Sequence, residues 1–346
     1  MRQETGAQQA LFTALAQRRE AFQAAKREWS ARLLRPTEPA ARMGGILPGP
    51  TPDQNVVGVA IGEKVTRGKP TGIPALKFLV QVKYPDAQIA ARERLPKVVD
   101  GLVTDVEQVG RLRRLVAAPP AVANPRARLR PAPPGCSIGF RDPKRRFVMA
   151  GTFGALVRDD QGAQYILSNN HVLADENQLP LGSPIYQPGL LDGGRVRRDK
   201  IATLTRFVPL QTDGTNQADC AIARALNNSL VTNAILEIGP PQGTTAAAID
   251  MVVHKFGRTT SYTVGHIVSA DADVKVDYDT GQYVFAGQML VVGLNNQPFS
   301  DAGDSGSLIV ERSTGQAVGL LFAGSSSHTI ANPIETALSL LNVTLA

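Results

Sequence analysis

The start of the chain has the spacing of one amphipathic helix. Apolar residues recur four and seven positions apart between residues 7 and 35, among Ala, Gln, Arg and Glu: Leu11, Leu15, Phe22, Trp29 and Leu33. This spacing places them on one helical face, and Pro36 ends the helix. The apolar face suits packing onto its own domain as well as a coiled-coil seam between subunits. A homo-oligomer therefore remains one of two open interpretations.

Strand patterns follow between residues 53 and 112. The runs VVGVAIG and ALKFLVQVKY predict two strands, and DAQIAARERL, opened by Pro85 and Asp86, predicts a short helix. KVVDGLVTDVEQVG predicts a hairpin that turns at Asp100 and Gly101. The segment holds no His or Cys, and its carboxylates are scattered. We therefore expect a small α+β module with a regulatory or assembly role.

A change of composition separates this module from the rest of the chain. Residues 117–135 are rich in Pro, Ala and Arg and lack apolar periodicity, which predicts an extended, exposed linker. Beyond it, short apolar runs are separated by Gly, Asp, Asn and Pro, as in antiparallel all-β domains. The predicted organisation is a helix in 1–45, an α+β domain in 46–116, the linker in 117–135 and a mainly β domain in 136–346.

One further helix is predicted at the end of the chain. Asn332 is the expected N-cap and Pro333 the expected first helical residue. Ile334, Leu338 and Leu341 then mark its apolar face.

Composition and charge narrow the class of protein. The 346 residues are 43 % hydrophobic, contain no apolar run long enough to span a membrane, and begin without the apolar stretch of an export signal, which predicts a cytoplasmic protein. Cys136 and Cys220 are the only cysteines and are expected as free thiols. Residues 1–135 hold 22 Lys/Arg against 11 Asp/Glu, but without the motifs of nucleic-acid-binding proteins, so nucleic acid is not an expected partner.

Three short segments carry candidate chemistry. His171 follows the strand pattern QYILS, Asp219 opens the apolar run CAIARA, and Ser305 lies in the turn DAGDSGS. These are a base, a residue that orients the base, and a nucleophile. The glycines of the turn let the backbone N–H groups of Gly303 and Ser305 point to one spot beside the serine hydroxyl, as an oxyanion hole requires. Asp213 and Asp199 are the competing candidates for the orienting carboxylate.

The motif G-D-S-G-S, together with N-H-V and D-x-A-I upstream, resembles the chymotrypsin/trypsin-like serine protease family. The order His171, Asp219, Ser305 resembles that family too. The resemblance covers residues 136–346 and implies a chymotrypsin-like double β-barrel with the triad in the cleft, here preceded by the N-terminal helix and the α+β domain. It implies hydrolysis of protein or peptide substrates through an acyl-enzyme, without a metal or cofactor.

A closer resemblance involves both halves of the chain. NVVGVAIGEKVTRGKPTG, GLVTDVEQVG, PGCSIGF and VHKFGRTTSYTVG are similar to a two-part intracellular subfamily that includes the plant narrow-leaf protease. The digestive members of the family need a freed Ile-Val-Gly-Gly amino terminus to pair with the aspartate before the serine. This chain has no such segment after a basic residue, so Asp304 requires another partner.

The family's specificity pocket falls on four apolar or small residues: Phe299, Leu321, Phe322 and Ala323. Because no acidic residue lies among them, the residue before the cleaved bond is expected to be uncharged. The alternative function is a binding or scaffold protein that keeps the protease fold but is catalytically silent.

Overall fold

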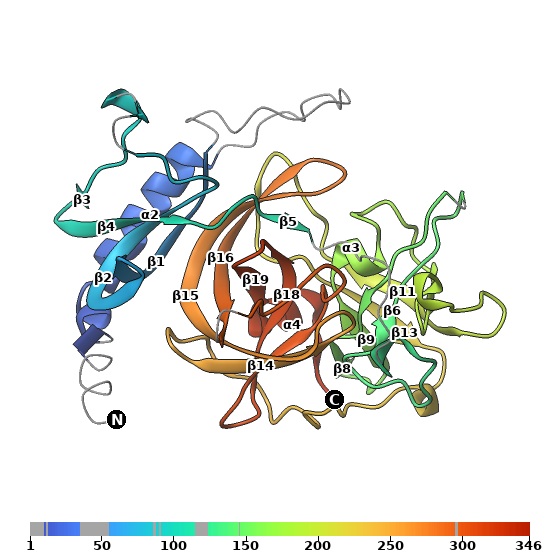
Figure 1. Cartoon of the computed structure of the whole chain (residues 1–346). Helices are drawn as coiled ribbons and strands as arrows, with labels where there is room; N and C mark the ends of the chain where they lie inside the picture. The colour runs from blue at the N-terminus through green and yellow to red at the C-terminus, as the bar shows by residue number, and fades with distance from the viewer. Residues whose placement is uncertain are drawn as a thin grey trace.

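The computed structural model describes residues 10–11, 13–34, 55–85, 88–89, 91–114, 124–144, 146–294 and 297–346. In these residues the chain is mainly β, with α-helices at α2 (Arg19–Leu33), α3 (Asn170–Leu173) and α4 (Ile334–Leu341). Figure 1 shows three parts: α2 with the first strands, a central group of long strands, and a third group around β9 and β13. None of the helices within the described residues has the length and apolarity needed to cross a membrane.

The central strands pair in a closed ring. They are β14 (Val252–Gly257), β15 (Ser261–Asp277), β16 (Gln282–Gly293), β17 (Leu308–Glu311), β18 (Ala317–Gly324) and β19 (Thr329–Pro333). The antiparallel pairs run from β14 through β15, β16, β19, β18 and β17 back to β14. Inside the ring lies an apolar cluster that includes Ile267, Met289 and Leu321. β12 (Thr215–Asn216) adds to the edge of β16.

A second sheet of six strands forms the third part of the molecule. Its order is β10 (Pro184–Tyr186), β11 (Lys200–Phe207), β13 (Ala221–Ala225), β9 (Gln164–Ser168), β8 (Ala155–Arg158) and β20 (Thr344–Leu345). A separate pair joins β6 (Ser137–Ile138) to β7 (Gly151–Thr152). The short helical turns are η3 (Ala91–Glu93), η4 (Asn124–Arg126), η5 (Leu190–Asp192) and η6 (Asn228–Leu230).

The front strands confirm the predicted hairpin. β3 (Val98–Val99) and β4 (Leu102–Gln108) are joined at Asp100 and Gly101, whose φ angles of 48° and 72° are those of a two-residue hairpin turn. β1 (Val56–Thr66) and β2 (Lys69–Val80) meet in the same way at Arg67 and Gly68. The helix predicted after β2 was wrong in the described residues: only the single turn η3 forms. Leu95 packs against an apolar cluster, but Ala91, Glu93 and Arg94 are exposed, so a helix here would bury little apolar surface.

The sheet continues from the front strands into the ring. β1 pairs antiparallel with β15, and Gly58 faces Val274. A Cβ atom at Gly58 would lie 2.9 Å from the carbonyl oxygen of Asp273, so the close approach of the two strands requires glycine. The domain boundaries remain a prediction. The pairing of β1 with β15 crosses the predicted boundary between the α+β domain and the β domain.

Helix α2 packs onto its own chain. Phe22 and Ala25 are buried in one apolar cluster with Val59 and Phe78 of the front strands. Lys26 donates to Asp273 of β15 at 2.9 Å and also forms an ion pair with Asp271. The apolar face thus has a partner within the chain, while association of copies remains a prediction.

The linker was predicted to be exposed, which holds for Ala127, Arg128 and Pro131 but was wrong for residues 132–135. Residues 132–135 are buried, and the Ala132 backbone N–H donates to Leu230 at 2.7 Å. Arg128 forms an ion pair with the buried Asp199 at 2.7 Å. Because the arginines find acceptors and the small apolar residues pack against the second sheet, composition alone misjudged this segment. Residues 117–123 lie outside the described residues.

The terminal helix begins one residue later than predicted. Pro333, with φ −54° and ψ 130°, is the N-cap of α4, while Asn332 belongs to β19 and uses its side chain elsewhere. The predicted apolar face is confirmed, since Ile334, Leu338 and Leu341 are buried.

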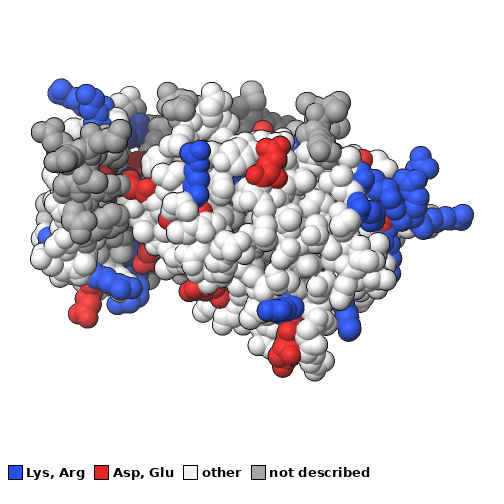
Figure 2. Space-filling model, turned by 90° about the horizontal axis from the view of Figure 1, so that it is seen from below, with Lys and Arg blue, Asp and Glu red and all other residues white. Residues whose placement is uncertain are grey.

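Charge is unevenly distributed over the surface. On the face in Figure 2 the largest group of Lys and Arg lies at one end of the molecule, and a broad uncharged area separates it from smaller groups of both signs.

Candidate active site

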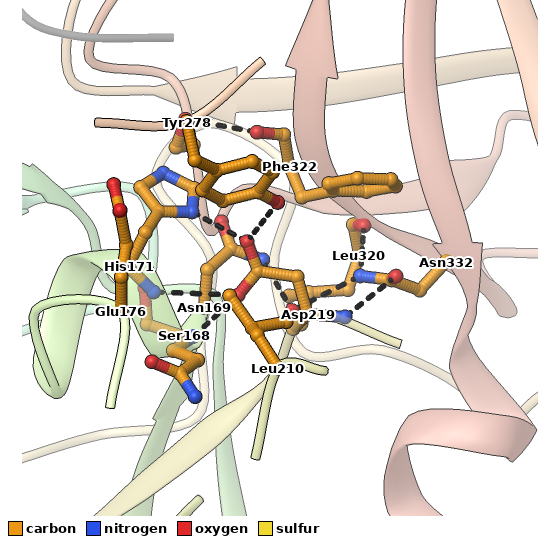
Figure 3. Close-up of polar contacts among 12 residues, drawn as sticks. Ser168, Asn169, His171, Glu176, Leu210, Asp219, Tyr278, Leu320, Phe322 and Asn332 are labelled. Atoms are coloured by element: carbon orange, nitrogen blue, oxygen red, sulfur yellow. Dashed lines mark hydrogen bonds and ion pairs between the residues drawn. The ribbon is translucent and has the colours of Figure 1, made fainter. Parts of the chain in front are cut away.

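The ends of two neighbouring strands bring His171 and Asp219 together. β9 and β13 pair antiparallel with Ser168 opposite Ala221, so α3 after β9 lies beside the residues that lead into β13. Nδ1 of His171 lies 2.6 Å from Oδ2 of Asp219, and both side chains are fully buried. Figure 3 shows the imidazole directed at this carboxylate. Of the two competing aspartates, Asp213 is exposed and Asp199 is bound by arginines.

The carboxylate of Asp219 receives several further donors. Tyr278 donates from Oη to the same oxygen at 2.6 Å, and Figure 3 shows it approaching beside the imidazole. The other oxygen accepts from the backbone N–H groups of Asn170 at 2.6 Å and His171 at 3.3 Å. These contacts fix the carboxylate and, through it, the orientation of the histidine ring.

Asn332 holds the backbone of Asp219. Its Oδ1 accepts from the Asp219 N–H at 3.0 Å, and its Nδ2 donates to the carbonyls of Asp219 and Leu320, both at 3.1 Å. Sequence reasoning missed both Tyr278 and Asn332. Nothing in the local pattern separates Tyr278 from Tyr283, and Asn332-Pro333 matches a helix cap.

The outer nitrogen of His171 is the unusual atom of the site. Nδ1 faces a carboxylate, so it carries the proton of a neutral ring, and Nε2 is then the basic nitrogen. Nε2 is buried and has no hydrogen-bond partner among the described residues. A buried polar atom without a partner is costly and often marks a functional position.

Ser305 lies in a turn held by β7 and β18. Gly303 and Gly306 have φ angles of 97° and 93°, which favour glycine. Thr152 donates from its backbone to Ser305 O at 2.8 Å and from Oγ1 to Gly303 O at 2.9 Å. Oγ of Ser305 lies 3.4 Å from the carbonyl oxygen of Phe322. The two residues proposed for the oxyanion hole are thus in one fixed turn.

Close packing across β7 brings the segment of His171 next to that of Ser305. A Cβ atom at Gly151 would lie 2.7 Å from the Val172 side chain and 3.0 Å from the carbonyl oxygen of Ser305. A Cβ atom at Gly306 would lie 2.1 Å from Oγ of Ser168. The predicted base, orienting residue and nucleophile therefore lie in one region, between the ring and the second sheet.

Asp304 has the partner that the sequence left unnamed. Lys255 of β14 reaches it, with Nζ 3.2 Å from Oδ2, and neither side chain is exposed. Burial lowers the pKa of Lys255, while the charge and hydrogen bond of Asp304 oppose that shift. Sequence reasoning missed Lys255 because a lysine within a strand usually faces solvent.

The four predicted pocket residues are buried but do not form one group. Phe299 and Leu321 belong to the apolar cluster inside the ring. Phe322 and Ala323 belong to another cluster, which contains Leu210 and Tyr278. The predicted pocket stays untested.

The two cysteine thiols are inaccessible because both side chains are buried. Cys136 and Cys220 are free and buried, and burial raises the pKa of both thiols. Within the part of the chain that the structure describes, no three His, Cys, Asp or Glu residues are placed to hold a metal ion.

Comparisons with known proteins give only distant likenesses. No protein-family model and no curated protein matches the chain. Protease A of Thermobifida fusca has a similar structure, with a TM-score of 0.44 and 19 % identity over 62 % of this chain and 97 % of that one. A glutamic acid specific serine protease also has a TM-score of 0.44, with 18 % identity over 62 % and 100 %. Chymotrypsin of Cellulomonas bogoriensis has a TM-score of 0.38, with 18 % identity over 56 % and 90 %. Likenesses of this size do not decide the chemistry, which is argued from the side chains.

Proposed function

We propose that this protein is a serine endopeptidase. Ser305 attacks the carbonyl of a peptide bond, His171 takes the hydroxyl proton through Nε2, and Asp219 holds the imidazole and stabilises the imidazolium that forms. The proton then passes to the leaving amine, and a water molecule releases the acyl group from Ser305 by the same route. The N–H groups of Gly303 and Ser305 stabilise the oxyanion.

One observation carries the proposal. The buried carboxylate of Asp219 accepts from Nδ1 of His171 at 2.6 Å, which leaves the buried Nε2 as an unpaired basic nitrogen in the region of Ser305. An unpaired buried ring nitrogen is not distinctive by itself, since His254 and His266 also have one, but His171 combines it with a buried carboxylate on its other nitrogen. A general base needs one nitrogen held and the other available.

The finer features belong to the same proposal. The ring of six strands and the second sheet are the two β-barrels of a trypsin-like protease, with the site between them. The substrates are proteins or peptides, and the protein acts in the cytoplasm as a member of the two-part subfamily.

The test is chemical labelling of Ser305. Incubation with diisopropyl fluorophosphate should add one phosphoryl group at Ser305, located by peptide mass spectrometry, and Ser305→Ala should remove it. The same substitution should lower kcat on casein by about 10⁶, as loss of the nucleophile does in related triads. A parental rate in the Ser305→Ala protein would exclude this mechanism.

A silent scaffold is the alternative, and one observation favours it: neither His171 nor Ser305 exposes any surface. Such a protein would keep the contacts but fail to label. The labelling experiment therefore separates the two functions.

A further inference from the structure

Next to Ser305, strand β18 changes partners along one of its edges. Leu308 of β17 pairs with Leu320. The backbone N–H of Leu321 then donates to the carbonyl of Ser307, and the backbone N–H of Gly306 donates to the carbonyl of Leu321. Beyond Leu321, β17 no longer pairs with this edge of β18. The edge at Ala323–Gly324 would therefore accept a further strand beside the nucleophile.

The chain fills this edge with a segment of its own. β5 (Arg113–Arg114) pairs antiparallel with β18, with Arg113 opposite Gly324 and Arg114 opposite Ala323. Figure 1 shows where β5 lies, beyond the front strands and close to the ring. In this register the next position of an antiparallel strand stands opposite Phe322, whose carbonyl oxygen is 3.4 Å from Oγ of Ser305. Facing residues on paired strands lie about 5 Å apart, so the carbonyl of a residue opposite Phe322 would be within reach of the Ser305 hydroxyl.

Three contacts anchor β5. Leu112 is buried in the apolar cluster that contains Leu210, Tyr278 and Phe322. The carbonyl of Leu112 accepts from the backbone N–H of Asp277 at 3.1 Å, and Arg111 forms an ion pair with the same aspartate. β5 is thus held as a peptide ligand would be, by backbone pairing and one apolar side chain.

In the proposed protease, an extended peptide substrate would pair with the Ala323–Gly324 edge as an added antiparallel strand. We propose that β5 occupies this place and excludes a peptide substrate until it is displaced. The inference rests on the proposed function of Ser305.

The same register predicts which substrate side chain should be apolar. Leu112 precedes Arg113, which faces Gly324, so it stands three positions before the residue that would face Phe322. A substrate in the place of β5 should carry an apolar side chain three residues before the residue whose carbonyl is attacked.

The experiment compares the full-length parent with Leu112→Asp, which places a charge in the apolar cluster and should release β5. Leu181→Asp is the matched control, because Leu181 is 64 % exposed. The substrates are the 4-nitroanilides of acetyl-Leu-Ala-Ala-Ala and acetyl-Asp-Ala-Ala-Ala. Acetyl-alanine 4-nitrophenyl ester, which is too short to pair with Ala323–Gly324, reports Ser305 alone.

Release should raise kcat/KM for the Leu peptide at least tenfold, mainly through KM, and change ester hydrolysis less than twofold. The peptide Val-Gly-Arg-Leu-Arg-Arg, which copies residues 109–114, should inhibit the Leu112→Asp protein competitively, and the same peptide with Asp for Leu should not. Arg111→Ala, which removes only the partly exposed ion pair, should act in the same direction if Leu112→Asp impairs folding.

Failure of this proposal differs from failure of the proposed function. If the ester is hydrolysed equally and the Leu peptide is cleaved at one rate by parent, Leu112→Asp and Arg111→Ala, β5 does not hold the substrate position, while Ser305 remains the nucleophile. If neither ester hydrolysis nor labelling occurs in any of them, the protease function itself is wrong, and the proposal falls with it.

Discussion

Lys255 and Asp304 form an ion pair that is fully buried directly beside the nucleophile. Nζ lies 3.2 Å from Oδ2, and the same carboxylate accepts from Thr260 Oγ1 at 2.6 Å and from the backbone N–H of Thr259 at 2.8 Å. These contacts tie the turn before Ser305 to β14 and its loop. The cation comes from within the chain, so the turn needs no freed amino terminus.

Removing this cation should damage both stability and activity. Lys255→Met leaves the Asp304 carboxylate buried without its counter-ion, and loss of one partner of such a pair costs about 3–5 kcal/mol. The free energy of unfolding in urea should fall by that amount, and peptidase activity should fall with it because the turn of Ser305 loosens.

The double variant Lys255→Met/Asp304→Asn is the control for this pair. It removes both charges and should recover more than half of the lost stability. Equal stability of Lys255→Met and the parent would contradict a structural role for the pair.

Asp219→Asn should abolish most turnover without unfolding the chain. The amide keeps the size of the carboxylate but cannot accept from Nδ1 and stabilise the imidazolium in the same way, and in the chymotrypsin example this change lowers kcat by about 10⁴. Asp213→Asn alters an exposed carboxylate and should leave kcat unchanged. Steady-state kinetics on one anilide decide the matter: equal rates for Asp219→Asn and the parent would show that this carboxylate does not orient the base.

Tyr278 is a positioning residue rather than a reacting one. Tyr278→Phe deletes the 2.6 Å hydrogen bond to Asp219 but keeps the ring, so kcat should fall about tenfold with KM within twofold, since a hydrogen bond to a charged group is worth about 1.5–3 kcal/mol. Tyr283→Phe is the matched control, because that hydroxyl bonds Thr280 and only its ring touches Tyr278. The idea fails if the two variants have the same kcat.

The sequence predicted those features that depend on interactions between residues close together in the chain. The hairpin at Asp100-Gly101 follows from the backbone angles that these residues tolerate, and the face of α4 follows from helical spacing. His171, Asp219 and Ser305 lie in one region as the motifs indicate, although their catalytic roles stay a proposal.

Features that depend on contacts distant in sequence were not predictable. Tyr278 reaches Asp219 across 59 residues, and Lys255 of β14 reaches Asp304 in the turn before Ser305. The pairing of β1 with β15 requires that residue 58 has no side chain. In the sequence, Gly58 is a glycine in a strand pattern, and nothing there indicates which strand approaches it. The end of the linker was misjudged for the same reason, since Ala132 is buried where its backbone bonds Leu230, a residue far along the chain.

The contact between the front strands and the ring should depend on pH through Glu107. This β4 residue is bound by His328, with Nε2 2.9 Å from Oε1, and by Lys77. Burial alone would raise the pKa of Glu107, but the hydrogen bond from His328 and the charge of Lys77 outweigh it and lower the pKa from 4.5 to about 2.

Because the pKa of Glu107 is lower in the folded than in the unfolded chain, the unfolded chain binds more protons between about pH 4.5 and pH 2. The stabilisation is therefore complete above pH 4.5 and is lost as the pH falls to about 2. It amounts to roughly 1–3 kcal/mol, since a shift of one pKa unit corresponds to about 1.4 kcal/mol and solvent screening weakens the interactions of a partly exposed group.

Glu107→Gln should lower the free energy of unfolding at pH 7 by this amount and should make that free energy fall less steeply below pH 4.5. Glu28→Gln, on the exposed face of α2, is the control and should change neither quantity. Urea titrations of the three proteins at pH 7, 4.5 and 3 measure this, and parallel pH curves for Glu107→Gln and the parent would exclude Glu107 as the titrating group.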